Sequence, residues 1–323
     1  MIFCFISVFF RSSNGVLLNL AIMLTVLPFL LLPWMFRRSV YILRLPSLAA
    51  LSSGLYAIIL IGLFVFLRET EIFTTLFVVL SMAIASLLGT GFLFFLLRKD
   101  TEIHNIPLKN IASGNWNYGR WLIASSLLII AAGQAQIFIA GSVLGVESAG
   151  IVRALQNFAQ PMILIVTAFG NLAIPTLSAD FGRADFQNFR NKVSIISVAS
   201  ISMASIYLLL LFIFRKPLEL LLYGGQYSSY ADLIPIWGIV PLLLAINVAP
   251  ASALQAFQKP YALLLVSAFW TVASVGSAFL FSDLWGIWGV TASAVFGYIV
   301  AVTVFAILYR IWVLREITLV RTQ

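Results

Sequence analysis

Residues 46–67 read PSLAALSSGLYAIILIGLFVFL, a run without a single charged side chain. A helix needs about 20 mostly apolar residues to cross the hydrocarbon core of a membrane. The stretch therefore predicts one membrane-spanning helix, and the remainder of the sequence has the same character.

Composition extends this prediction to the whole chain. Of 323 residues, 62% are hydrophobic and 9% are charged, and the mean hydropathy is +1.07. A water-soluble chain is roughly half apolar and about a quarter charged. The composition excludes a water-soluble domain and predicts an all-α polytopic membrane protein.

Nine stretches are long and apolar enough to be spans. They are residues 16–36, 46–67, 74–97, 121–144, 155–177, 194–214, 233–256, 262–282 and 287–309.

The loops between these spans differ in their positive charge. The loops after the first, third, fifth and seventh spans, together with the C-terminal tail, hold 14 of the 19 Lys and Arg residues. Cytoplasmic loops carry the excess of Lys and Arg in membrane proteins. The charge pattern predicts a cytoplasmic C-terminus and places residue 1 on the opposite side.

Two parts of the sequence resemble each other. The stretch YILRLPSLAALSSGLYAI (41–58) aligns with QAFQKPYALLLVSAFWTV (255–272), which places Pro46 over Pro260. Transporters are commonly built from internal repeats. At this offset, residues 112–323 form one complete six-helix C-terminal lobe, and residues 1–111 form an incomplete N-terminal lobe of three transmembrane helices. We expect the remainder of a twelve-helix, two-lobe transporter without its first three helices; the alternative is a genuine nine-helix protein.

The span at 155–177 and its lead-in carry the most informative polar residues. Arg153, Gln156, Asn157 and Gln160 follow the i, i+3, i+4, i+7 spacing of one helix face. Asn171 continues this polar stripe. Because polar side chains are costly against lipid, the stripe is expected to face a water-filled cavity and to bind an anionic, hydroxyl-rich substrate. The alternative is hydrogen bonding between helices.

Two further amides are candidate substrate-binding residues in other spans. Gln134 lies at the centre of 121–144, and Asn247 lies within 233–256. The acidic residues all lie in loops or at span ends, and the single Cys and single His leave no metal-ligating cluster. No phosphate loop or nucleophile motif occurs, so we expect no enzymatic activity, no cofactor, no metal and no nucleic-acid partner.

Several runs carry a family resemblance. They are YGRWLIASSLLI (118–129), GSVLGVESAGIVRALQNFAQP (141–161), NLAIPTLSADFGR (171–183) and the Gly-Ile-Trp-Gly at 286–289. They resemble the polysaccharide-transporter branch of the multidrug/oligosaccharidyl-lipid/polysaccharide (MOP) exporter superfamily. The resemblance implies a MATE-like fold of two six-helix lobes around a central cavity.

The same resemblance implies a function and a location. Such proteins flip polyprenyl-diphosphate-linked oligosaccharides from the inner to the outer leaflet of the bacterial inner membrane, for O-antigen, capsule or exopolysaccharide synthesis. The expected partners are the lipid-linked oligosaccharide, the bilayer, and polysaccharide polymerase and glycosyltransferase machinery.

Three alternatives remain at this point. A MATE-type drug or cation antiporter usually requires a carboxylate within a span, and the nine spans hold none. A peptidoglycan-precursor flippase would use similar chemistry on a different sugar. The third alternative is a truncated, non-transporting product.

Overall fold

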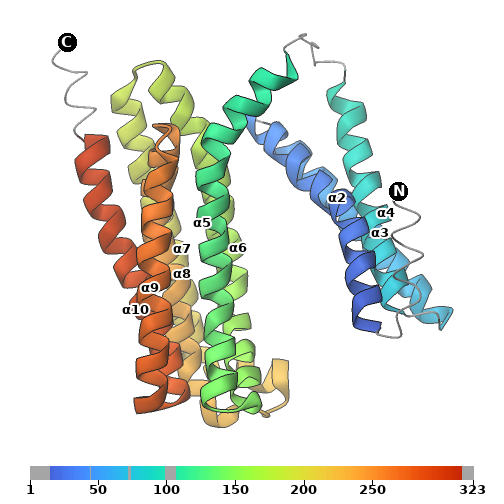
Figure 1. Cartoon of the computed structure of the whole chain (residues 1–323), viewed down its shortest axis with the longest axis vertical. Helices are drawn as coiled ribbons and strands as arrows, with labels where there is room; N and C mark the ends of the chain where they lie inside the picture. Colours follow the sequence, from blue (N-terminus) through green and yellow to red (C-terminus); the bar gives the residue numbers. More distant parts are fainter. Residues whose placement is uncertain (1–14, 44, 72–73, 99–106, 315–323) are drawn as a thin grey trace. The chain divides into compact units, whose positions relative to one another are not determined.

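The computed structural model describes residues 15–43, 45–71, 74–98 and 107–314, and these residues form helices joined by short turns (Figure 1). Within this part of the chain, nine helices are long and apolar enough to cross a membrane. The prediction of an all-α polytopic membrane protein is confirmed. The helices are α2 (Gly15–Ile42), α3 (Pro46–Glu69), α4 (Thr75–Leu97), α5 (Leu108–Val143), α6 (Val146–Gly182), α7 (Phe186–Tyr223), η1 (Ser228–Leu233), α8 (Ile234–Ala256), α9 (Pro260–Trp285), α10 (Ile287–Leu308) and η2 (Tyr309–Leu314).

Three helices are much longer than the apolar runs predicted. The lengths of α5, α6 and α7 are 36, 37 and 38 residues. In particular, α5 begins at Leu108, inside the polar stretch 98–120 that hydropathy assigns to a connector between spans. Hydropathy detects burial in hydrocarbon, whereas a helix continues into water wherever its backbone hydrogen bonds are kept.

The chain divides by internal contacts into two units, Met1–Asn105 and Ile106–Gln323. Unit 1 contains α2, α3 and α4, and α4 packs against both of the others. Unit 2 contains α5 to α10, and there α10 packs against both α8 and α9. The division lies close to the boundary expected from the sequence repeat, and the assignment of lobes stays a prediction.

The backbone around Pro46 and Pro260 has the same geometry in both units. Each proline begins a helix. The residue before Pro46 is Leu45, with φ −113° and ψ 60°, and the residue before Pro260 is Lys259, with φ −106° and ψ 62°. Three backbone hydrogen bonds also match between the two turns. In unit 1 they run from Leu43 to Ser39, from Leu45 to Val40 and from Leu48 to Leu45, with the amide donor named first. In unit 2 they run from Phe257 to Ala253, from Lys259 to Leu254 and from Ala262 to Lys259. The two turns are equivalent residue by residue, as the aligned stretches require.

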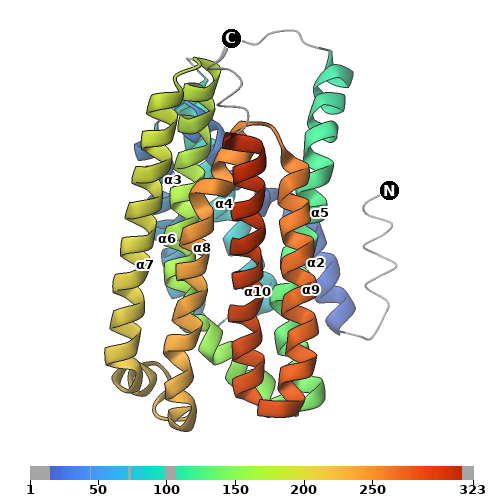
Figure 2. The same cartoon turned by 90° about the vertical axis from the view of Figure 1, so that its left-hand side faces the viewer.

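Small polar side chains join the helices of unit 2. Figure 2 shows α7, α8, α10 and α9 side by side, and α5 packs against α9. Along that last interface the hydroxyls of Ser125 and Ser267 lie 2.6 Å apart, and Thr271 donates to the carbonyl of Leu128 at 3.2 Å. Hydroxyls and small residues are the usual means of helix association where lipid removes the hydrophobic driving force.

A glycine on α10 allows a close approach of this helix to α9. A Cβ at Gly297 would lie 2.7 Å from the Cβ of Ser274, a residue with no exposed surface. By contrast, a Cβ at Gly276, on α9, would meet no atom within 4 Å.

We therefore expect Gly297→Ala to lower the stability of the chain in detergent by about 1–3 kcal/mol, because the added methyl overpacks the interface. The measurement is the thermal unfolding midpoint followed by circular dichroism. Gly276→Ala is the matched control and should leave the midpoint unchanged or slightly higher. Equal effects of the two substitutions would contradict the close packing described here.

Candidate functional site

The polar stripe predicted on α6 lies along the outer side of unit 2. Arg153, Asn157 and Gln160 are exposed, and Asn171 is half-buried. These residues lie on the face of α6 that α8, its main packing partner in this unit, leaves uncovered. Three predicted substrate-binding side chains are thus brought together on one accessible face.

Gln156 differs from its neighbours because it points into the unit. Its side chain is 7% exposed, and its Nε2 lies 3.5 Å from Oε1 of Gln136 on α5. Gln136 in turn donates to the hydroxyl of Ser274 on α9 at 3.0 Å. Gln156 therefore belongs to a buried chain of hydrogen bonds that links three helices. For this residue the structure shows hydrogen bonding between helices, which was the alternative to substrate binding for the stripe.

Asn157 is held in place from a neighbouring helix. Its Nδ2 donates to the hydroxyl of Tyr223 at 3.0 Å, and that hydroxyl donates to the carbonyl of Ala154 at 3.3 Å. The ring of Tyr223 packs edge-on against Phe158. A tyrosine at the end of α7 thus orients the amide of Asn157 and leaves its carbonyl oxygen accessible.

The two candidates outside α6 have opposite environments. Gln134 is exposed on α5. The contact between Gln136 and Gln156 sets the register of the antiparallel helices α5 and α6. Gln134 lies two residues before Gln136 and is therefore level with residue 158 of α6, at a rise of about 1.5 Å per residue. Asn247 is 5% exposed and lies in the interior of unit 2, between Ala245 and the packed Val248.

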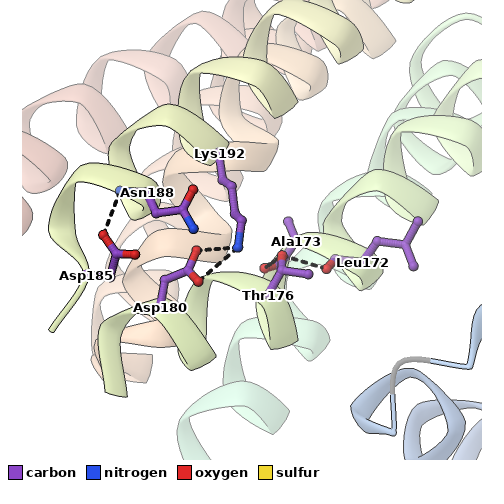
Figure 3. Close-up of polar contacts among 7 residues, drawn as sticks. All are labelled: Leu172, Ala173, Thr176, Asp180, Asp185, Asn188 and Lys192. Atoms are coloured by element: carbon purple, nitrogen blue, oxygen red, sulfur yellow. Dashed lines mark hydrogen bonds and ion pairs between the residues drawn. The ribbon is translucent and has the colours of Figure 1, made fainter. Parts of the chain in front are cut away.

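The buried acidic residues of unit 2 lie at the ends of helices and have partners. Asp180 forms an ion pair with Lys192 at 2.6 Å across the turn between α6 and α7 (Figure 3). In the same turn, Asp185 caps α7 by accepting a hydrogen bond from the amide of Asn188 at 3.1 Å. Glu219 accepts from the amide of Tyr227 at 2.8 Å. Both carboxylates therefore hold loops in place.

The described residues contain no group of three or more His, Cys, Asp or Glu side chains that could hold a metal ion. A cavity in unit 1 is lined by Arg37, which belongs to the loop after the first predicted span and gave no sign of a site in the sequence.

Comparison with known proteins identifies the fold. No family model matches the chain, and no curated protein matches it. Solved structures do match. A MATE transporter in the straight conformation aligns with a TM-score of 0.86 at 14% identity, over 100% of this chain and 75% of the other. The chain has the fold of MATE transporters.

Two further structures extend the comparison. A mutant of the MATE transporter VcmN from Vibrio cholerae aligns with a TM-score of 0.80 at 16% identity, over 94% of this chain and 72% of the other. A MOP superfamily transporter from Pyrococcus furiosus aligns with a TM-score of 0.75 at 18% identity, over 98% and 74%. For that protein, a binding pocket of reverse polarity suggests a different function.

The buried amide chain predicts a coupling between two residues. Gln136→Ala and Gln156→Ala should each destabilise unit 2, and the double variant should lose less than their sum by about 0.5 kcal/mol, a typical value for side-chain hydrogen bonds between membrane helices. The free energy of unfolding of all three variants is measured by denaturation in mixed micelles. Gln134→Ala, two residues away and exposed, is the control and should unfold like the unaltered chain. A purely additive double variant would show that the two amides do not interact.

Proposed function

We propose that the chain acts in the transmembrane export of polyprenyl-diphosphate-linked oligosaccharides, flipping them from the inner to the outer leaflet for surface polysaccharide synthesis. The observation that carries the proposal is the exposed face of α6, where Arg153, Asn157 and Gln160 offer one cation and two amides. The MATE fold supports transport as the general activity.

The charge of this face favours an anionic substrate. The described carboxylates of unit 2 lie near helix ends, and the two buried ones bind a lysine or a backbone amide. An exporter of cations usually carries a carboxylate within its spans. A guanidinium presents a fork of donors that fits phosphate oxygens, and it stays charged at every physiological pH.

The residues divide between the parts of such a substrate. Arg153 binds the diphosphate, while the amides of Asn157, Gln160 and Gln134 exchange hydrogen bonds with sugar hydroxyls. The polyprenyl tail stays in the lipid. Alternating access moves the polar head past these side chains. The proposal includes a bacterial inner-membrane location, a cytoplasmic C-terminus, and polymerase and glycosyltransferase machinery as partners.

A second candidate function is drug or cation export. Its support is that the matching solved structures include several MATE transporters. Both functions use the same fold, so the chemical class of the transported molecule separates them.

The test is leaflet exchange in proteoliposomes that contain the purified chain and a lipid-linked oligosaccharide labelled on its sugar. Arg153→Ala should slow flipping about tenfold or more, because a charge-assisted contact with the diphosphate is lost. Arg153→Lys should retain part of the rate. Arg183→Ala, at the opposite end of the same helix, is the matched control and should flip normally.

Two results would count against the proposal. Normal flipping by Arg153→Ala would remove the role of α6. Transport of a fluorescent organic cation, without any flipping of the oligosaccharide, would establish the cation-export alternative. If the chain moves neither molecule, the non-transporting alternative stands.

A further inference from the structure

Unit 1 contains a cavity lined by residues of all three of its helices. Its volume is about 330 Å³, and it lies between α2, α3 and α4. Arg37 and Trp34 of α2, Ser53 and Tyr56 of α3, and Ser86 and Gly89 of α4 contribute to its wall. The volume falls at the lower end of the range of small-molecule sites, about 300–1,000 Å³.

Arg37 is fixed in this wall by three contacts. Its Nε donates to the carbonyl of Pro33 at 3.2 Å, its Nη1 donates to the hydroxyl of Ser53 at 3.4 Å, and its guanidinium lies 5.0 Å from the ring centre of Trp34. An arginine side chain has five N–H donors. Three of them have no partner among the described residues, and the half-buried guanidinium is held in one orientation.

No described carboxylate of unit 1 balances this charge. The described acids of unit 1 are Glu69, the last residue of α3, and Glu71, just beyond it, whereas Ser53 lies toward the other end of the helix. Sixteen residues of helix separate Ser53 from Glu69, or about 24 Å at 1.5 Å per residue. A cation in a partly apolar wall is costly unless an anion pairs with it. The cavity therefore favours an anionic occupant.

The cavity wall changes character along the helices. Arg37 lies near the end of α2, whereas Leu30 lies seven residues deeper, about 10 Å along the same helix. On α4, Met82 lies farther from the C-terminal end of the helix than Gly89 does. The cationic end is thus near the helix ends and the apolar end is toward the middle of the span. This polarity fits a molecule with an anionic head and an apolar tail.

We propose that the Arg37 cavity binds the phosphate group of a membrane lipid, with the phosphate on the guanidinium and the first part of the tail against Leu30 and Met82. The phenolic hydroxyl of Tyr56 is a further donor in the same wall. The proposal shares its lipid-phosphate chemistry with the proposed function, and it places that chemistry in a second, separate site within unit 1.

The neighbouring residue provides the matched control. Arg38 carries the same charge at the same depth, but it is exposed and does not line the cavity. If Arg37 served only as a headgroup anchor at the helix end, the two arginines would be equivalent. A specific site makes them different.

The experiment is a titration of the purified full chain in detergent, followed by tryptophan fluorescence. Trp34 contacts the guanidinium, so its emission should report occupancy, and Trp34→Phe should remove that part of the signal. The probes are a polyprenyl diphosphate, phosphatidic acid with ordinary acyl chains, and inorganic pyrophosphate. We expect Arg37→Gln to raise the dissociation constant of the lipid phosphates about tenfold, and Arg38→Gln to leave it unchanged.

Each outcome has a defined meaning. Arg37-dependent binding of the polyprenyl diphosphate alone assigns the site to a transported lipid, and equal binding of phosphatidic acid assigns it to the surrounding bilayer. Equal losses from Arg37→Gln and Arg38→Gln, or pyrophosphate bound as tightly as the lipids, would overturn the proposal. If Arg37→Gln unfolds at a much lower temperature than the unaltered chain, Arg37→Lys replaces it, and partial binding is then expected.

The binding readout does not depend on transport. Loss of flipping in Arg153→Ala with intact binding at Arg37 would support both sites. Arg37-dependent binding in a chain that flips no oligosaccharide would retain this inference and reject the proposed function.

Discussion

A polar group inside hydrocarbon has no water to bind, and this single constraint governs both the fold and its polar sites. The backbone meets it by forming helices throughout the described spans. Side chains within the spans meet it by pairing, as Ser125 does with Ser267 and Gln136 with Ser274. Donors and acceptors also remain available on the exposed face of α6 and around Arg37, and these groups carry the two proposed sites.

The apolar runs predicted the helices well because each crossing needs a minimum length of apolar sequence. The same reasoning missed the extensions of α5, α6 and α7, since a helix outside the membrane needs no apolar side chains. The match of Pro46 with Pro260 was found from few identities. It survives in the backbone, where both turns take the same angles, and each proline keeps the residue before it out of the helical region.

The polar sites were harder to predict from the sequence. The spacing of Arg153, Gln156, Asn157 and Gln160 marks one face of a helix, but only the position of α5 decides that Gln156 is covered and Asn157 is not. Arg37 was overlooked for a related reason. An arginine near the end of a span usually interacts with headgroups, and the walls that distinguish it from Arg38 come from α3 and α4.

The unequal helix lengths of unit 2 have a consequence for the lipid around it. The lengths of α8, α9 and α10 are 23, 26 and 22 residues, or about 33–39 Å, whereas α5 to α7 extend to about 54–57 Å. A bilayer core is about 30 Å thick, with differences of a few Å among natural membranes. The short helices match that thickness closely and resist thinning or thickening, while the long ones tolerate both. Bilayer thickness therefore constrains the short helices of this unit more tightly than the long ones.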